Sequence, residues 1–210
     1  MKLYQLFSKD EAKEIVSRLE GWSKGQASSQ YASRHVKNNE ELQFTDSEDI
    51  KALLAGIHSR LVKSPLHREH LVRHVMVPKF NRYREGGEYK SHADAGWMGE
   101  KIRTDLACTI FLNDDYEGGE LCANGLAIKG PPGSCVVYEC WRPHHVAPVT
   151  KGERICAITW MQSLIPDHTQ LELLQMLQGL MNEIDRTSSE ERLYAPISSI
   201  YGKLVRMWMN

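Results

Sequence analysis

Hydrophobic positions near the N-terminus recur at helical spacing in two stretches. Ser8 and Glu11 have the spacing of a capping box, in which each side chain satisfies the free backbone N–H of the other residue. One apolar face follows, made of Ala12, Ile15, Val16 and Leu19. Residues 21–47 are polar and predict a long loop. A second helix is expected to start near Asp46 or Ser47 and to bury Ile50, Leu53, Leu54, Ile57 and Leu61.

The pattern changes after residue 71 to short segments that are rich in β-branched and apolar residues. Clusters of Gly, Pro, Asn and Asp separate them, and the runs 117–119 and 131–133 tolerate turn geometry. Eight short strands with turns between them favour a double-sheet β-barrel or jelly roll over an α/β sheet. We predict strands at 74–81, 88–92, 105–112, 119–123, 125–128, 134–138, 144–149 and 154–162.

Helical spacing returns after Pro166. One apolar stripe consists of Leu171, Leu173, Leu174, Met176, Leu177 and Leu180. A second stripe is most simply a packing face, with a homodimer contact as the alternative; it consists of Ile197, Ile200, Tyr201, Leu204, Val205 and Trp208. The expected fold is therefore mainly β with flanking helices. We divide it into an N-terminal helical part that packs on the barrel (1–70), the barrel core (71–165) and a C-terminal helical extension (166–210).

Composition narrows the class of protein without naming a function. A chain of 210 residues is long enough for one domain with a substantial core. Its formal net charge of -1 gives no sign of attraction to nucleic acid or to anionic membranes. No apolar run approaches the roughly 18 residues that a membrane-spanning helix needs, and the start turns polar too early for a secretory signal. We therefore expect a cytoplasmic protein.

Neither the cysteines nor one group of histidines is expected to bind metal. The five cysteines form no Cys-x-x-Cys pair and lie among apolar residues, so we expect them to be reduced and mostly buried. His67, His70 and His74 would share one face of a helix and could bind Zn(II). No carboxylate or cysteine completes that set, and we interpret the three as ordinary surface histidines.

His92, Asp94 and His144 form a candidate metal site in the barrel segment. Residues two apart on a strand point to the same face, so His92 and Asp94 can converge on one ion. His144 begins a later predicted strand. Two imidazoles and one carboxylate suit non-haem Fe(II) and leave positions open for a 2-oxo acid and O2. His145 is the competing ligand, and strand alternation alone does not choose between the neighbours.

Arg154 begins the last predicted strand, ten residues after His144. Its guanidinium is a planar fork that pairs with a carboxylate, so it could anchor the distal carboxylate of 2-oxoglutarate. Tyr83 could add a hydroxyl at the same end. Each pattern is weak alone, because His-x-Asp is common by chance, but their combination within a Gly-punctuated β region predicts a 2-oxoglutarate-dependent iron site.

The motifs around these residues resemble a known family. Residues 83–94, YREGGEYKSHAD, resemble a motif of the prolyl 4-hydroxylase superfamily. Residues 103–121 and 144–163 are similar to the bacterial PKHD-type hydroxylases, and so are Val36–Asn39, Phe80–Tyr83 and the ending 204–208. The resemblance thus covers nearly the whole chain. The Pro four residues after His144 and the Arg ten residues after it match the motif and select His144 over His145.

This resemblance implies a double-stranded β-helix barrel with iron held by His92, Asp94 and His144 and 2-oxoglutarate held by Arg154. It also implies hydroxylase chemistry with O2, and ascorbate (vitamin C) as reductant. It does not supply the substrate, which could be a prolyl residue of a peptide or protein, a free amino acid or another small molecule. A metallo-hydrolase or isomerase and a non-catalytic binding module are the rival functions.

Several residues near the expected site have open roles. The segment 140–143 is bulkier than in the family, and the loop 94–103 looks specific to this chain, so both bear on the substrate rather than on the metal. Lys37 could contact substrate or lie in a plain loop. Trp97 and Trp141 could be substrate platforms or buried aromatic residues of the barrel rim, and Arg103 could approach the co-substrate or the substrate.

Overall fold

Two antiparallel sheets form the body of the protein in this computed structural model, which describes all residues except 1, 29–35, 100, 188–189 and 210. The larger sheet has the order β1 (Leu3–Gln5), β14 (Ser134–Glu139), β10 (Leu106–Phe111), β17 (Arg154–Ser163), β6 (Lys79–Tyr83), β4 (Glu40–Leu42) and β2 (Ser23–Lys24), and β5 (Val72–Val75) also pairs with β17. The smaller sheet has the order β13 (Leu126–Ile128), β12 (Leu121–Ala123), β15 (His144–Val146), β7 (Glu88–His92) and β3 (Lys37–Asn38).

Short pairs and helices complete the fold. β11 (Glu117–Gly118) pairs with β16 (Val149–Lys151), and β8 (Trp97–Met98) pairs with β9 (Ile102–Arg103). The helical segments are α1 (Lys9–Ser17), the 3-10 turn η1 (Gly25–Ser28), α2 (Glu48–Lys63), α3 (Pro65–Glu69), α4 (His168–Thr187) and α5 (Glu191–Trp208). The expected fold class, mainly β with flanking helices, is confirmed.

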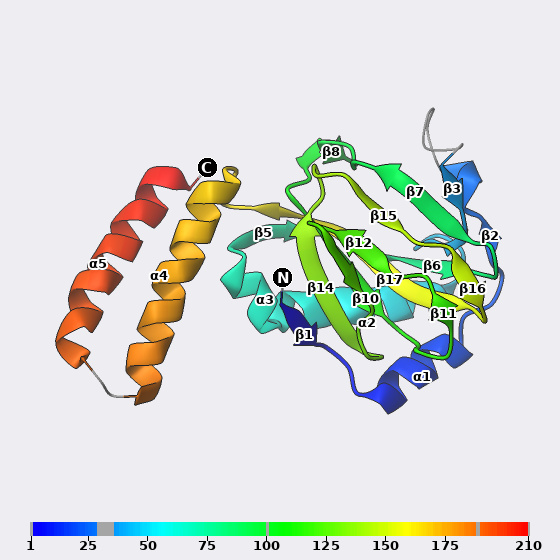
Figure 1. Cartoon of the computed structure of the whole chain (residues 1–210), viewed down its shortest axis with the longest axis horizontal. Coiled ribbons are helices and arrows are strands. Elements are labelled where there is room, and N and C mark those ends of the chain that lie inside the picture. The colour runs from blue at the N-terminus through cyan, green and yellow to red at the C-terminus, as the bar shows by residue number, and fades with distance from the viewer. Residues whose placement is uncertain (1, 29–35, 100, 188–189, 210) are drawn as a thin grey trace.

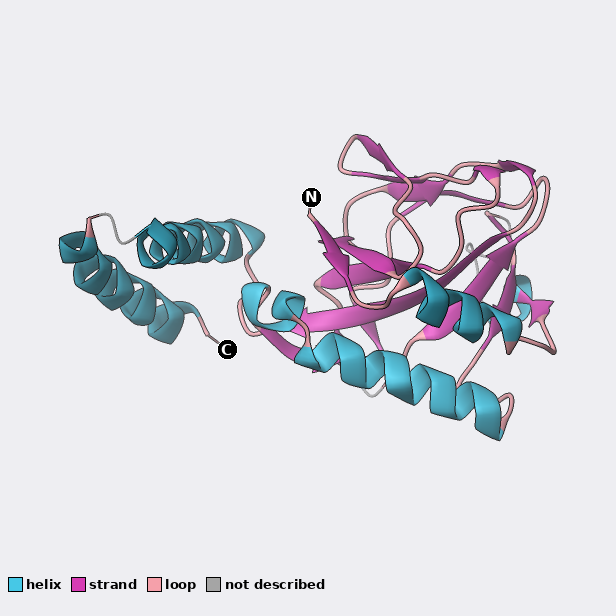
Figure 2. Ribbon diagram, turned by 90° about the horizontal axis from the view of Figure 1, so that it is seen from below, coloured by secondary structure: helices cyan, strands magenta, loops and turns pink. Residues whose placement is uncertain are grey.

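Side-chain alternation on the larger sheet separates two hydrophobic clusters. Cys108, Ile110 and Val137 face outward, where they pack with the buried faces of α1 and α2. Figure 2 shows these helices covering that face of the sheet. Ala107, Val136 and Tyr138 face the other way and pack against Leu121 and Ala123 of the smaller sheet. The barrel interior is therefore built by both sheets, and the helices support it from outside.

The first two helices form as the sequence predicts. Ser8 and Glu11 make both bonds of the capping box at the start of α1. Ser47 caps α2, where its hydroxyl accepts a hydrogen bond from the Ile50 N–H. The five residues predicted for the buried face of α2 are all buried: Ile50, Leu53, Leu54, Ile57 and Leu61.

Several predicted boundaries are wrong. The expected loop 21–47 contains β2, β3, β4 and η1 in its described part, and residues 29–35 of that prediction lie outside the described residues. The predicted strand 74–81 is divided between β5 and β6, and 144–149 is divided between β15 and β16. β8, β9 and β11 were not predicted. Strands of two or three residues have no readable periodicity, and they form because a partner strand supplies their hydrogen bonds.

α4 and α5 form a helical hairpin that projects from the barrel (Figure 1). Leu171 and Leu174 are buried, whereas Leu173, Met176 and Leu180 are exposed, so only part of the first predicted stripe packs. In the second stripe, Tyr201, Leu204, Val205 and Trp208 pack against the main core, whereas Ile200 is exposed. Among the described residues, no helix is long and apolar enough to cross a membrane. The domain boundaries at 70 and 165 stay predictions.

Candidate functional site

The strand pair β7–β15 brings the three candidate metal ligands together. His144 lies directly opposite His92 in the pairing of the two strands, and the Asp94 N–H donates to Cys140 O (2.9 Å). Asp94 Oδ1 lies 3.6 Å from His92 Nε2, and Asp94 Oδ2 lies 3.6 Å from His144 Nε2. These separations are too long for hydrogen bonds. They suit three ligand atoms arranged around one ion, and all three lie within 4.8 Å of one another.

Backbone carbonyls orient both imidazoles toward this point. His92 Nδ1 lies 2.8 Å from Lys90 O, and His144 Nδ1 lies 2.9 Å from Arg142 O. A proton on each Nδ1 satisfies these carbonyls and leaves the Nε2 lone pair facing Asp94. Burial lowers the pKa of His144, although Asp94 opposes the shift, and this favours the neutral imidazole that ligates metals. His145 lies opposite Cys122 in the β12 pairing, so it is His144 that faces His92 and Asp94.

Two aromatic side chains fix the remaining freedom of these ligands. The Tyr89 ring stacks on the His92 ring, with 3.6 Å between centroids. The Trp160 indole N–H donates to Asp94 Oδ2 (2.9 Å). Tyr89 lies on β7 together with His92, whereas Trp160 lies on β17 of the larger sheet, so the position of Asp94 depends on closure of the barrel.

Arg154 lies buried in the barrel beside Tyr83. The two residues are directly opposite in the β6–β17 pairing, and Arg154 is only 1% exposed. Its Nη1 donates to Cys156 Sγ (2.9 Å), whereas its Nε has no hydrogen-bond partner among the described residues. The Tyr116 hydroxyl is likewise buried without a partner in that part of the chain. Burial raises the pKa of Tyr83 well above its usual value, so its hydroxyl stays protonated and able to donate.

The site fits iron and 2-oxoglutarate. One pocket is lined by Tyr83, His92, Asp94, His144 and Arg154, so the metal-ligand set and the guanidinium open to the same space. The donor set of two imidazoles and one carboxylate suits non-haem Fe(II). A buried cation with an unsatisfied N–H is costly unless an anion reaches it, and a carboxylate bound in this pocket would pair with Arg154.

Gly119 leaves room for this arrangement, and its replacement gives a first testable prediction. A Cβ there would lie 2.9 Å from Val149 Cγ2, 3.1 Å from Arg154 Cδ and 3.2 Å from Tyr116 Cε2, and the backbone φ is +67°. We expect Gly119→Ala to lower the free energy of unfolding by about 1–3 kcal/mol. Displacement of Arg154 should also weaken 2-oxoglutarate binding about tenfold or more. Denaturant unfolding and titration calorimetry measure the two effects.

Gly125→Ala is the matched control, because Gly125 has a φ of +76° and nothing within 4 Å of an added Cβ. Gly125→Ala introduces the strain of a positive φ without a steric clash, and it should leave the 2-oxoglutarate affinity unchanged. If Gly119→Ala and Gly125→Ala lost the same stability and the same 2-oxoglutarate affinity, crowding of Arg154 at Gly119 would not explain the effects.

Other residues that the sequence analysis singled out lie elsewhere. Arg103 donates to Asp105 and to the Ser163 carbonyl, so it is held away from the pocket. Trp97 and Trp141 are 63% and 55% exposed, which contradicts the alternative that they are buried in the barrel rim. Conversely, Lys79 lines the pocket and Tyr116 lies beside Arg154 at Gly119, although the sequence predicted a role for neither; Tyr116 stood only within the family-like motif 103–121.

His67, His70 and His74 do not share a helix face, since α3 ends at Glu69 and His74 lies on β5. His70 is no ordinary surface residue: it lies between Tyr4 and Gln175, and burial lowers its pKa to about 4. All five cysteines are free, and four are buried, as predicted.

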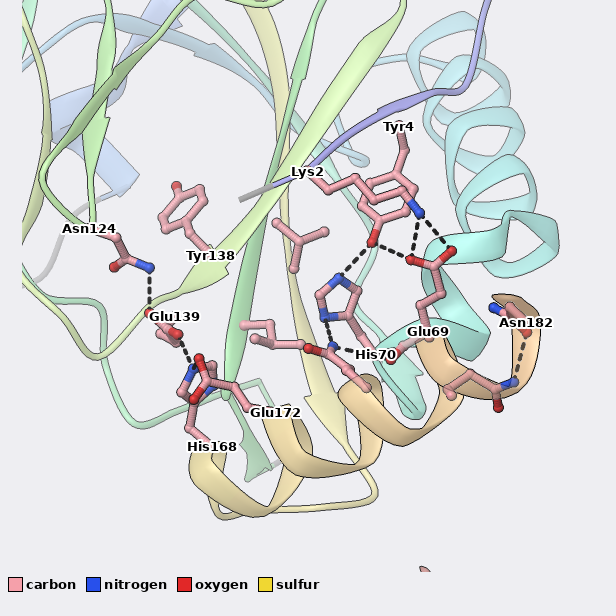
Figure 3. Close-up of a pocket in the computed structure, with 15 residues that line it drawn as sticks. Lys2, Tyr4, Glu69, His70, Asn124, Tyr138, Glu139, His168, Glu172 and Asn182 are labelled. Atoms are coloured by element: carbon pink, nitrogen blue, oxygen red, sulfur yellow. Dashed lines mark hydrogen bonds and ion pairs between the residues drawn. The ribbon is translucent and has the colours of Figure 1, made fainter. Parts of the chain in front are cut away.

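A second cavity lies between the barrel and α4 (Figure 3), where Glu139, His168 and Glu172 form another group of metal-ligand type. Glu139 Oε2 accepts from Asn124 Nδ2 (2.7 Å) and is paired with Arg142 Nε (3.2 Å), while Oε1 is paired with His168. Since cationic and amide groups already hold Glu139, we interpret the cluster as an ion-pair junction that attaches α4 to β14. It also holds Arg142, whose carbonyl orients His144.

Comparisons with known proteins agree with this geometry. Residues 78–162, which include the candidate ligands and Arg154, match the 2OG-Fe(II) oxygenase superfamily. A PKHD-type hydroxylase of Caulobacter vibrioides is 33% identical over 200 residues, which cover 89% of this chain and 88% of that protein. A PKHD-type hydroxylase of Bordetella pertussis is 31% identical over 225 residues, which cover 100% and 99% of the two chains.

Solved structures share the fold at low sequence identity. A Pseudomonas putida prolyl-4-hydroxylase has a TM-score of 0.55 and 16% identity, covering 77% of this chain and 91% of its own. A viral collagen prolyl hydroxylase from Paramecium Bursaria Chlorella virus-1, solved as a 2OG complex, has a TM-score of 0.56 and 16% identity, with 77% and 94% covered. A Trichoplax adhaerens prolyl hydroxylase, solved with a hypoxia inducible factor peptide fragment, has a TM-score of 0.53 and 16% identity, with 76% and 82% covered.

The fold is thus the double-stranded β-helix of 2-oxoglutarate- and Fe(II)-dependent dioxygenases. Within that class, the chain belongs to the PKHD-type hydroxylases. This family membership makes the chain an oxygenase, rather than the non-oxidative metal enzyme or binding module that the residues alone left open.

Proposed function

We propose that this dioxygenase holds Fe(II) through His92, Asp94 and His144 and holds 2-oxoglutarate through Arg154 and Tyr83, and that it hydroxylates a peptidyl or amino-acid-like substrate. One observation carries the assignment. Three ligand atoms face one point, and a guanidinium without a carboxylate partner among the described residues opens to the same pocket.

The chain's own residues position the reactants. Iron and 2-oxoglutarate together supply the oxidation of a C–H bond by O2, with release of succinate and CO2. Arg154 pairs with the distal carboxylate of 2-oxoglutarate, and the protonated Tyr83 hydroxyl donates to the same end. Apolar residues of the pocket wall, among them Leu121, Val146 and Ile158, exclude water from the reacting atoms.

A peptide as substrate is supported by the prolyl hydroxylase of the same fold that was solved with a peptide fragment. A free amino acid or another small molecule is the alternative. A need for ascorbate, a cytoplasmic location and a homodimer stay predictions.

Anaerobic titration tests the assignment of cofactors to these residues. Fe(II) followed by 2-oxoglutarate should produce a weak visible charge-transfer band that neither compound produces alone with the protein. A protein that binds neither compound, or that develops the same band without His144, would contradict the assignment. Succinate release during a screen of prolyl peptides, free amino acids and other metabolites then identifies the substrate.

Tyr116 gives a second testable prediction, because its hydroxyl is buried without a partner among the described residues. In the ligand-free protein, Tyr116→Phe should leave the free energy of unfolding unchanged or raise it by about 1 kcal/mol, since an unsatisfied hydroxyl costs free energy. If that hydroxyl donates to bound 2-oxoglutarate, the same variant should bind the co-substrate about tenfold more weakly. Tyr201→Phe, on α5, is the control. Unchanged co-substrate affinity in Tyr116→Phe would exclude the contact.

A further inference from the structure

Two lysines reach the pocket from opposite sheets. Lys37 on β3 and Lys79 on β6 both line the pocket that contains the candidate iron ligands. Both ammonium groups are paired with the same oxygen, Oε1 of Glu41; the Lys79 distance is 2.9 Å. Lys37 and Glu41 are 5% and 1% exposed, so this ion cluster lies inside the barrel rather than at its surface.

Each lysine lies one side chain away from a candidate iron ligand. Lys37 Nζ is 5.7 Å from the centroid of the Tyr89 ring, which stacks on His92. Lys79 Nζ is 5.5 Å from the centroid of the Trp160 ring, whose N–H donates to Asp94. The ammonium groups therefore lie beside the space in which a substrate would approach the metal.

The charges of the described residues that line the pocket do not balance. Lys37, Lys79 and Arg154 are cationic, and Asp94 is the one carboxylate among these lining residues. Glu41 lies behind the pocket wall and is a second anion beside Asp94, so that two anions face three cations. Bound Fe(II) adds two positive charges and 2-oxoglutarate adds two negative charges, so the excess of one positive charge stays the same. A net positive charge in a poorly solvated pocket is costly, and an anion that enters it is favoured.

Lys79 is the better ligand-binding group of the pair. Lys37 and Glu41 take part in further interactions of the chain, whereas the side chain of Lys79 is 20% exposed. Burial, and then the nearby Lys79, lowers the pKa of Lys37 to about 8. Glu41 already lies between the two lysines, and a second anion beside Lys79 would relieve the repulsion that remains.

We propose that Lys79, with Lys37 beside it, forms an anion subsite that binds a carboxylate of the substrate next to the iron. This subsite rests on the proposed function, since it presupposes that iron and 2-oxoglutarate occupy the adjoining space. It defines the substrate class as compounds with a carboxylate near the oxidised carbon. The carboxylate can come from a chain terminus or free acid, or from an acidic side chain.

The test uses the full chain loaded with Mn(II) and N-oxalylglycine, an unreactive analogue of 2-oxoglutarate. Titration calorimetry then compares three probes: N-acetylproline, N-acetylglutamate α-amide and the neutral N-acetylproline amide. We expect saturable binding of at least one carboxylate probe and none of the neutral amide. The tighter carboxylate probe shows whether a terminal or a side-chain carboxylate is preferred.

Variants assign the binding to Lys79. Lys79→Met should weaken the carboxylate probe about tenfold or more, the loss expected for one charge-assisted hydrogen bond. Lys79→Arg should keep most of the affinity. Lys90→Met is the matched control, because Lys90 lies on β7 with its side chain 60% exposed. Lys90→Met should bind Mn(II) and N-oxalylglycine as the wild-type protein does, and each Lys79 variant is first saturated with both compounds so that the probes are compared on the loaded protein.

The proposal is overturned if the wild-type protein binds neither carboxylate probe, binds the amide equally well, or keeps its affinity in a folded Lys79→Met variant. The comparison of the carboxylate probes with N-acetylproline amide uses the wild-type protein alone. It therefore tests the proposal even if Lys79→Met folds poorly. Failure of the proposed function is distinguishable, because the initial titration with Mn(II) and N-oxalylglycine would then already show no binding.

Discussion

Asp94→Ala is expected to abolish succinate formation. Asp94 is the one carboxylate in the candidate ligand set, and its two oxygens face His92 and His144 at 3.6 Å each. Without it, two neutral imidazoles remain, and we expect Fe(II) affinity to fall by more than the roughly 10–100-fold typical of losing a group that only orients a ligand. Metal titration and a succinate assay measure the two losses.

The same variant should leave the metal-free fold intact. Ligand binding stabilises the native state by mass action, so Fe(II) should raise the unfolding temperature of the wild-type protein but not that of Asp94→Ala. Asp114→Ala is the control, because Asp114 is an exposed carboxylate paired with Lys9. Wild-type succinate formation by Asp94→Ala would refute the assignment of this residue to the metal.

Arg154→Met is expected to weaken 2-oxoglutarate binding by roughly 30-fold or more, corresponding to the 2–5 kcal/mol that truncating one partner of a buried charge pair costs. Metal binding should be nearly unchanged, because Arg154 is not among the candidate ligands. Calorimetric titration of 2-oxoglutarate into the Mn(II)-loaded variant separates the two effects. Unchanged co-substrate affinity would remove Arg154 from the site.

Although Arg154→Met should weaken 2-oxoglutarate binding, it should not destabilise the ligand-free protein. Arg154 is 1% exposed and its Nε has no partner among the described residues, so methionine removes a costly buried cation and keeps much of the volume. We expect the ligand-free protein to unfold at equal or higher denaturant concentration. Arg82→Met is the matched control: Arg82 is on the neighbouring strand, where it pairs with Glu40 and stacks on Trp22, and its loss should not affect 2-oxoglutarate.

Local sequence patterns predicted those parts of the fold whose causes are local. The capping box at Ser8 and Glu11 and the buried face of α2 follow from spacing along a single helix. Strand alternation also predicted that His92 and Asp94 converge, although β7 ends at His92 and Asp94 follows the end of the strand. The motif around His144 and Arg154 also identified the family, because its residues are short-range neighbours in sequence.

The parts that were not predicted depend on distant partners. β3 and β4 exist because β7 and β6 supply their backbone hydrogen bonds, and no periodicity within residues 21–47 could show this. Lys79 lines the pocket, and Tyr116 lies with Arg154 around Gly119; these residues come from segments of the chain that only barrel closure brings together. The choice of His144 over His145 depended on a family motif until the β7–β15 pairing placed His144 opposite His92.

The amino-acid sequence by itself therefore determined the class of fold, and it predicted the metal-binding chemistry and the side chains that would supply it, because these follow from periodicity, residue type and a family motif. Only the tertiary structure decided how the pocket is completed: a buried Arg154 whose Nε has no hydrogen-bond partner among the described residues, and two lysines that share Glu41. Burial and electrostatic imbalance are properties of the space between strands, so they arise only when segments far apart in the chain enclose it.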